Sequence, residues 1–429
     1  MTQTHSIASM SRLLLMLAAA GLSACESALE VETPSRIPAE QLETPGNAGL
    51  LVTSVVADFE CAFGAYVVLG GMVGDELLDA TQTADRWPYD RRGMLRSDRR
   101  YAVSACPALG VYTPLQTARV SAENVIRLLN GWTDAEVPNR QFLLAKASAY
   151  AGYSLQLLGE GFCSMAVSNI NADRSVAYGG EITRDSVFRL AEARFTAAIT
   201  GGGADADIMN MALVGRARAR QQRGDWAGAR ADALVAPPGY VKSATASTTS
   251  SRRENRVWAQ SSATSSAVTV GVLYRTMNDP RVPVVDEGRI AAGTSVDVWR
   301  QEKYTLATAP IRIASGDEAR LIRAEADIML NPGDPTVADS IINAFRQDGN
   351  QAPIASTSQA EAIAFLVDQR RRELFLEGQH LGDYIRYQLP FNPPAGDPYH
   401  ISGLTYASGR CLPLPDVERL GNPEVPDEP

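Results

Sequence analysis

The stretch RARARQQRGDWAGARADA, from Arg216 to Ala233, predicts the architecture of this chain. Two runs with helical spacing flank the turn RGDW, and Pro237 and Pro238 end the second run, because proline cannot continue a helix. Small residues recur on both runs and would let two helices approach closely; they are Ala212, Gly215, Ala219, Ala227 and Ala231. The segment therefore predicts a helical hairpin.

Further helical segments lie on both sides of this hairpin. Apolar residues recur every three or four positions in residues 112–132, 134–161, 186–202, 314–330 and 334–350. We expect Asp134 to cap the second of these segments, which would end at Gly159. One hairpin cannot bury its own apolar face, so these segments are expected to stack on it.

Two parts of the chain break the helical pattern. Residues 241–269 are rich in Ser, Thr and Ala and predict a loop region, with a short strand at RVWAQ, Arg256 to Gln260. The last part of the chain is rich in proline. The Arg216–Ala233 segment resembles a tetratricopeptide repeat hairpin, in which an acidic-aromatic pair follows the turn glycine. We therefore predict an all-α fold: a tetratricopeptide-like helix-turn-helix scaffold with long irregular loops and a Pro-rich C-terminal segment.

The first 24 residues have the composition of an export signal. The apolar run LLLMLAAAGL, Leu13 to Leu22, is too short to span a bilayer as a helix. It leads into LSAC, Leu22 to Cys25, which resembles the bacterial lipobox, where the signal is cut before a cysteine that becomes lipidated. We expect residues 1–24 to be a lipoprotein signal peptide and Cys25 to carry the lipid. The alternative is an ordinary secretory signal cut after Ala24.

The segment after Cys25 predicts a tether. Residues 26–46 contain three prolines and five glutamates, a composition that favours an extended chain. Acyl chains on Cys25 would hold the protein at a membrane without a spanning helix. We expect residues 25–46 to form an N-terminal tether and the folded part to begin near residue 47.

Composition and motifs exclude several classes of function. The chain is 45% hydrophobic and 21% charged, which is typical of a globular protein, and its net charge of −9 makes nucleic acid an unsuitable partner. We find no GxSxG, HExxH, P-loop or GxGxxG motif, and only His380 and His400 follow the signal. We therefore expect no catalytic residues and no cofactor. A glycoside hydrolase stays open as an alternative, because its two carboxylates need no sequence spacing.

Four cysteines follow Cys25, an even number that suits disulfides in an exported chain. No CxxC spacing occurs, so neither a zinc site nor a redox motif is expected. Four cysteines allow three pairings. We favour Cys61 with Cys106 and Cys163 with Cys411; four buried thiols are the alternative.

The stretch QRRRELFLEGQHLGDYIRY, Gln369 to Tyr387, contains a ladder of polar side chains. Steps of three and four residues separate its members, which would share one face of a continuous helix: Glu373, Glu377, His380, Asp383 and Arg386. Gly378 and Gly382 weaken a metal-site interpretation, because glycine inside a helix costs about 1 kcal/mol relative to alanine and often marks a break. We interpret the ladder as a structural network and expect no metal site.

Several segments, taken in order, resemble the SusD/RagB family of outer-membrane nutrient-binding lipoproteins. They are the signal with LSAC, the helix pair at about 112–160, EARLIRAEADIML followed by Asn343 to Arg346, the Gln369–Tyr387 stretch, and LPLPDVERLGNP. The residues matching the family's C-terminal pattern are Arg371, Arg372, Glu373, Leu374, Glu377, Gly378, Asp383 and Arg386, followed by Pro413, Pro415, Glu418, Asn422 and Pro423.

This resemblance implies a location, a partner and a mode of action. The protein would sit, lipid-anchored and surface-exposed, on the outer membrane of a Gram-negative cell. It would bind oligosaccharides or peptides and deliver them, without chemistry, to a SusC-like TonB-dependent transporter. Residues 47–429 would form the SusD-like domain, with an N-terminal tetratricopeptide-like part over 47–240 and a C-terminal part over 241–429.

The best candidate for ligand contact is ADRWPYDRRGML, Ala84 to Leu95. Pro and Gly punctuate this stretch, which predicts a loop, and its aromatic and polar side chains suit the C–H faces and hydroxyls of sugars. The candidate residues are Asp85, Arg86, Trp87, Tyr89 and Asp90. The alternative is that Trp87 and Tyr89 pack on the helical body. Trp132 and Trp226 favour repeat packing, whereas Trp258 and Trp299 suit either role.

A plain scaffold is the main rival function. Outer-membrane assembly lipoproteins also combine a lipid anchor with tetratricopeptide-like helices. The acidic-glycine, Asp-x-x-Arg and Pro-x-Pro features near the C-terminus argue against it, since plain solenoids lack them. A neighbouring gene for a TonB-dependent transporter would favour nutrient uptake over this rival.

We expect Cys25→Ser to abolish lipidation and leave the protein soluble in the periplasm, because the thiol is the acylated atom. Incorporation of labelled palmitate, followed by fractionation of the cells, measures this outcome. Label retained by the variant would contradict the lipobox interpretation.

Overall fold

The computed structural model describes residues 38–201, 205–262 and 265–426. The expected signal peptide, Cys25 and most of the expected tether lie outside these residues. Residues up to Asn47 group as a separate small unit. Within it, α2 (Ala39–Leu42) and the 3-10 helix η1 (Pro45–Asn47) are joined by the Asn47 side-chain amide, which donates to the Gln41 and Leu42 carbonyls at 3.1 Å. The second unit runs from Ala48 onward.

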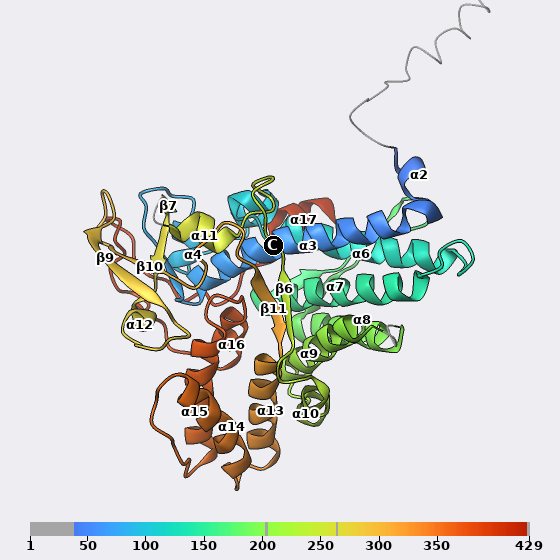
Figure 1. The fold of residues 1–429 in the computed structure, drawn as a ribbon. Coiled ribbons are helices and arrows are strands. Elements are labelled where there is room, and N and C mark those ends of the chain that lie inside the picture. Colours follow the sequence, from blue (N-terminus) through green and yellow to red (C-terminus); the bar gives the residue numbers. More distant parts are fainter. Residues whose placement is uncertain (1–37, 202–204, 263–264, 427–429) are drawn as a thin grey trace, which may run out of the picture. The chain divides into compact units, whose positions relative to one another are not determined.

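Helices of the second unit pack against one another in the order of the chain (Figure 1). The long ones in this array are α6 (Tyr112–Gly131), α7 (Arg140–Gly161), α8 (Arg184–Gly201), α9 (Ala206–Gln222), α10 (Trp226–Val235), α13 (Gly316–Leu330), α14 (Thr336–Asp348) and α15 (Gln359–Glu373). Each buries one face on the next helix, as stacked hairpins must. The predicted all-α, tetratricopeptide-like scaffold is confirmed.

Glycines let these helices approach closely. The ring of Phe195 on α8 lies between Gly152 of α7 and Gly215 of α9, where an added Cβ would come within 2.7 Å and 2.4 Å of ring carbons. Larger residues would push the helices apart, since packed interiors have no spare volume. The small residue at position 215 therefore serves the close packing that the sequence predicts.

The core also contains α3 (Ala48–Val73), which packs on α6 and α7. The helical stretch Pro45–Val73 is long and apolar enough to cross a membrane by length and composition alone. However, 72% of its most apolar window is buried inside the protein, as in a core helix of a soluble fold.

The hairpin at RGDW has the expected turn. Gly224 adopts φ 73°, a left-handed conformation that glycine reaches at little cost. The Asp225 side chain then caps α10 by accepting a hydrogen bond of 3.0 Å from the Gly228 N–H. Local sequence thus determines both the end of one helix and the start of the next.

Two local predictions are wrong. Asp134 does not cap α7, because that helix starts after Asn139. The Asp134 carboxylate instead pairs with the Arg140 guanidinium at 2.7 Å. RVWAQ is not a strand but most of α11 (Arg256–Ser261), because the Asn255 side chain accepts from the Trp258 N–H and nucleates a helix.

Short strands and helices form the connections. The strands pair antiparallel as β1 (Leu77–Asp79) with β8 (Val268–Val270), β2 (Ser164–Ala166) with β5 (Glu181–Thr183), β3 (Asn169–Ile170) with β4 (Val176–Ala177), β6 (Val241–Ala244) with β11 (Ile311–Ser315), and β9 (Val284–Ile290) with β10 (Asp297–Gln301); β7 is Ser265–Ser266. The short helices are α4 (Trp87–Asp90), α5 (Arg99–Val103), η2 (Cys106–Ala108), α12 (Val272–Arg275), α16 (His380–Arg386) and α17 (Asp416–Gly421).

The Gln369–Tyr387 stretch does not form one continuous helix. It breaks between α15 and α16, where Leu376 and Gly378 adopt φ 55° and 80°. A Cβ on Gly378 would lie 3.1 Å from a methyl group of Val67, so the break also brings this turn against α3. The polar ladder is therefore split, and its members face different partners.

The acidic members of the ladder pair with cations from several elements. Glu377 binds Lys303 at 2.6 Å and also pairs with Arg312, whereas Asp383 binds Arg370 at 2.6 Å. Arg386 pairs with Glu325 of α13 and, within the ladder, with Asp383 at 2.9 Å. Burial, together with the nearby Arg371, lowers the pKa of His380 to about 3. The ladder is a structural network, and among the described residues no group of three or more His, Cys, Asp or Glu is arranged to hold a metal ion.

One buried ion pair connects the first helices of the array to the later ones. Arg218 of α9 donates to the Glu318 carboxylate of α13 at 2.5 Å and 2.9 Å, and also to the Ile313 carbonyl at 2.9 Å. Both side chains are at most 2% exposed. Burial alone would lower the pKa of Arg218, but Glu318 and Glu160 raise it above its ordinary value. The two paired residues are 100 positions apart in the sequence.

We expect Arg218→Met to lower the free energy of unfolding by about 3–5 kcal/mol, because it leaves Glu318 buried without its cation. Urea denaturation followed by circular dichroism measures the change. Arg189→Met is the matched control: the Arg189–Asp185 pair is 63% and 50% exposed, so its loss should cost about 0–1 kcal/mol. Equal, small changes in the two variants would contradict the assigned role of Arg218.

Candidate functional site

The segment predicted to contact ligand, residues 84–95, contains the short helix α4 where the sequence predicted a loop. Pro88 sits in its first turn, a position that tolerates proline. Asp85 forms an ion pair with Arg100. The guanidinium of Arg86 donates to the Gln260 side chain at 2.9 Å, which connects α4 to α11.

Two of the five candidate residues are buried and cannot contact a ligand in this structure. Tyr89 is 0% exposed and packs edge-on against Tyr101, with 6.5 Å between ring centroids. Asp90 is 1% exposed and accepts a hydrogen bond of 2.8 Å from the Tyr399 hydroxyl. Tyr89 therefore packs on the helical body, as the alternative interpretation of the sequence had it.

The other three candidates reach the surface. Asp85 is exposed, while Arg86 and Trp87 are partly exposed. The indole Nε1 of Trp87 is covered and has no acceptor among the described residues, so the accessible part of this side chain is ring carbon. The segment therefore presents an aromatic surface beside a carboxylate and a guanidinium.

Behind this surface lies a cluster of buried acids. The Asp79 carboxylate accepts from the Thr81 hydroxyl at 2.9 Å, and its other oxygen is 3.8 Å from the His400 Nε2 atom. Burial raises the pKa of Asp79 to about 6 and that of Asp90 to about 8. Burial also lowers the pKa of His400. Because Asp79 and Asp90 are at most 1% exposed, they anchor the segment and cannot serve a bound substrate.

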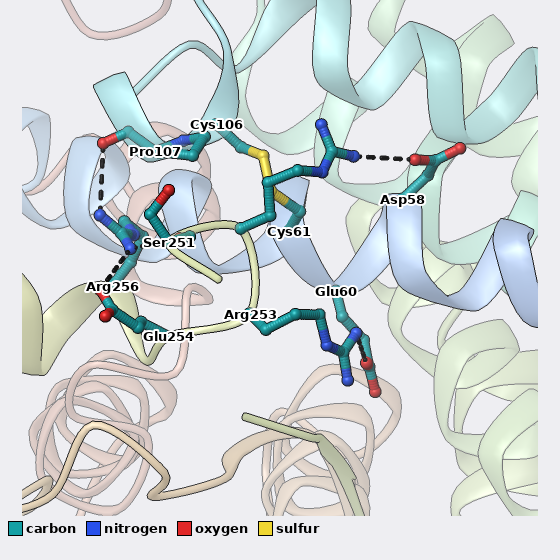
Figure 2. The surroundings of a disulfide bond; sticks show 10 residues. Asp58, Glu60, Cys61, Cys106, Pro107, Ser251, Arg253, Glu254 and Arg256 are labelled. Carbon is teal, nitrogen blue, oxygen red and sulfur yellow. Dashed lines mark hydrogen bonds and ion pairs between the residues drawn. A yellow bond between two sulfur atoms is a disulfide. The ribbon is translucent and has the colours of Figure 1, made fainter. Parts of the chain in front are cut away.

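The Ser- and Thr-rich loop is clamped to α3, and this clamp positions α11 (Figure 2). Arg253 pairs with Glu60 at 2.7 Å and Arg252 with Asp58 at 3.0 Å. Arg256, the first residue of α11, donates to the Pro107 carbonyl at 3.3 Å, next to the Cys61–Cys106 disulfide.

Two disulfides join segments that are distant in the sequence. Cys61 joins η2 to α3 with a Cα–Cα distance of 5.8 Å, and Cys163 joins the end of α7 to Cys411 near the C-terminus at 5.2 Å. These are the two pairs that the sequence analysis favours.

Trp258 and Trp299 lie near the same region and are partly exposed. Trp258 is on α11, while Trp299 is on β10, which packs beside β8. The Arg275 guanidinium lies 5.9 Å from the centroid of the Trp299 ring. The β8 strand also pairs with β1, which precedes the candidate segment, and α11 contacts the segment through the Arg86–Gln260 hydrogen bond. Both tryptophans therefore lie on elements near the segment.

Two cavities beside α17 were not anticipated from the sequence. One has a volume of 290 Å³ and is lined by Arg96, Asp98, Val103, Val417 and Leu420, among others. The other has a volume of 280 Å³ and lies between α6, the β3–β4 hairpin and α17. Their lining residues come from distant parts of the chain, so no local motif could have predicted them.

One sequence comparison decides the family. The sequence model of the SusD family matches residues 185–410, which is more than half of the chain. The chain belongs to the SusD family. Among curated proteins, no match is found.

Several solved structures with the same fold come from species of Bacteroides and Parabacteroides. A SusD-like carbohydrate binding protein from Bacteroides vulgatus is 15% identical, with a TM-score of 0.67 over 89% of this chain and 97% of that one. A SusD superfamily protein from Parabacteroides distasonis is 11% identical, with a TM-score of 0.69 over 92% and 99%. A further SusD superfamily protein, from Bacteroides thetaiotaomicron, is 14% identical, with a TM-score of 0.64 over 90% and 98%. At these identities the likeness shows the fold.

We expect Asp90→Asn to flatten the pH dependence of stability in this SusD-family protein. Burial raises the pKa of Asp90 to about 8, so the folded state keeps the proton up to about that pH, whereas the unfolded chain releases it near its ordinary pKa of 3.8. Between these values stability therefore falls as pH rises, by at most about 1.4 kcal/mol per pH unit for one group.

Urea denaturation of both proteins at pH 5, 6, 7 and 8 checks this prediction. The excess stability of the wild type over the variant should shrink steadily toward pH 8. Asp85→Asn is the control, since Asp85 is exposed. Parallel curves for wild type and Asp90→Asn would mean that Asp90 is ionised in the folded protein.

Proposed function

We propose that this SusD-family protein binds nutrient oligosaccharides or peptides at the outer membrane and delivers them, without chemistry, to a SusC-like TonB-dependent transporter. The observation that carries the proposal is the family match over residues 185–410. It is supported by the shared fold with a protein described as a SusD-like carbohydrate binding protein. A lipid anchor at Cys25 and exposure on a Gram-negative outer membrane belong to the same proposal.

The proposed ligand surface is centred on Trp87. Its accessible ring carbons suit the C–H face of a pyranose, while Asp85 and Arg86 offer an acceptor and a donor for hydroxyl groups. The Arg86–Gln260 hydrogen bond fixes this surface relative to α11, so little conformational freedom would be lost on binding. Trp258 and Trp299 would extend the surface toward longer ligands.

The positions of the carboxylates in this region favour ligand binding over glycoside hydrolysis. Glycoside hydrolysis needs two carboxyl groups that flank the bound substrate. The two buried acids behind the proposed surface, Asp79 and Asp90, do not reach it. Incubating the purified protein with any glycan that it binds, and assaying for new reducing ends, tests the hydrolase alternative.

The scaffold alternative predicts different neighbouring genes. A protein that only assembles other proteins needs no transporter, whereas a nutrient-binding lipoprotein needs one to receive its ligand. A TonB-dependent transporter encoded beside this chain would favour nutrient uptake, and its absence would favour the scaffold.

The division of the domain near residue 240, into an N-terminal tetratricopeptide-like part and a C-terminal part, belongs to the proposal based on the SusD family.

We expect Trp87→Ala to weaken glycan affinity at least about ten-fold while the melting temperature is kept, because the ring is partly exposed and would lose its stacking partner. A glycan-array screen of the wild type first supplies the ligand, and isothermal titration calorimetry then compares the variants. Trp132→Ala is the matched control, since Trp132 follows α6 and lies outside the proposed surface. Joint loss of affinity and melting temperature would make Trp87 a core residue.

A further inference from the structure

Three arginines are among the largest fully buried side chains of the described residues: Arg92, Arg119 and Arg218. Arg92 forms an ion pair with Asp75 at 2.7 Å, and Arg218 forms one with Glu318 at 2.5 Å. Arg119 is 2% exposed, yet among the described residues no carboxylate accepts a hydrogen bond from it. A buried charge ordinarily has an opposite charge beside it, so Arg119 differs from the other two.

Only neutral acceptors surround the Arg119 guanidinium. Its Nε donates to the Gln116 side chain at 2.8 Å, Nη1 donates to the Asn169 side chain at 3.0 Å, and Nη2 donates to the Ser168 carbonyl. A guanidinium has five N–H groups. Two of them, one on each terminal nitrogen, therefore have no acceptor among the described residues.

The nearest carboxylates are engaged elsewhere. Glu123 accepts two hydrogen bonds from Arg194, and Glu418 accepts one from Tyr112 at 2.6 Å and one from Asn422 at 2.9 Å. Burial lowers the pKa of Arg119 below its ordinary value, although Glu123, Tyr112 and Glu418 act in the opposite direction. In Arg218, by contrast, the direct ion pair reverses the effect of burial. The positive charge of Arg119 is thus incompletely compensated.

Arg119 lines the 280 Å³ cavity between α6, the β3–β4 hairpin and α17. Its aliphatic lining is formed by Val120, Ala166, Ile170 and Val176. The polar and charged residues that complete the lining are Gln116, Ser168, Asn169, Arg119 and Glu418. Val176 is 47% exposed, which places it where the cavity meets solvent. The cavity therefore combines one under-compensated cation with an apolar wall and an opening.

We propose that this cavity binds the carboxylate of a small organic acid with an apolar body. Arginine and carboxylate match as planar partners, and a charge-assisted pair is stronger in a desolvated site. The aliphatic wall offers no aromatic ring for stacking a sugar, so a hydrocarbon or aryl body fits better than a pyranose. Glu418 at the wall disfavours multiply charged anions such as phosphate. This site is separate from the Trp87 surface and does not depend on its function.

Isothermal titration calorimetry of the purified protein with benzoate and isovalerate tests the proposal, with benzamide and isovaleramide as uncharged isosteres. We expect the acids to bind at least about ten-fold more tightly than the amides, since hydrogen bonds between two charged groups are stronger than those to a neutral group. Arg119→Met should remove this preference. Arg127→Met on the same helix is the matched control, because Arg127 hydrogen-bonds only to Asn124 among the residues described and does not line the cavity.

Equal binding of acid and amide, or no binding of either acid up to about 10 mM, would overturn the proposal. Glucuronate or inorganic phosphate binding as tightly as benzoate would overturn it too, since neither has an apolar body. Should Arg119→Met fail to fold, a second pair of variants decides: Val176→Asp should weaken benzoate binding and Val176→Lys should strengthen it. Unchanged benzoate affinity in both Val176 variants would place the carboxylate elsewhere.

Discussion

The buried ion pair between Arg218 and Glu318 is the interaction on which the rest of the structure depends. It joins α9 to the first turn of α13 at 2.5 Å and 2.9 Å, with both charges at most 2% exposed. Its geometry is demanding, because two desolvated charges stabilise a fold only when their hydrogen bonds are complete. The strands β6 and β11 pair with each other beside this ion pair. The long excursion of the chain between them, residues 245–310, therefore leaves the helical array and returns to it at one place.

That excursion supplies most of the elements around the proposed ligand surface. Arg252 and Arg253 clamp its loop to α3, and α11 then receives the hydrogen bond from Arg86. Residues 84–95 are held by the buried Asp90, whose carboxyl group accepts a hydrogen bond from the Tyr399 hydroxyl. The surface around Trp87 is thus built from a rigid frame rather than from a free loop, which favours binding with a small entropic cost.

Buried charges with an ion-pair partner and the buried charge without one have different roles in this protein. In the Gln369–Tyr387 stretch every member of the acidic ladder faces a cation, and the network orients α15, α16 and α13 against one another. Arg119 has no such carboxylate, and it lies at a cavity that opens to solvent. The acids of the Gln369–Tyr387 stretch hold the fold through their ion pairs. Arg119, in contrast, is the side chain that we propose to bind a ligand.

The sequence by itself determined the helical scaffold, the RGDW hairpin and the family resemblance, because helix periodicity, caps and turn glycines act within a few residues of each other. Tertiary structure decided the rest. It placed the turn at Gly378, which the sequence marked as a break, against Val67, and it buried Tyr89 and Asp90, which composition alone had placed in a loop. It also assembled the Arg119 cavity from α6, a β-hairpin and α17. Burial and cavity shape depend on contacts between residues far apart in the chain, which no local pattern encodes.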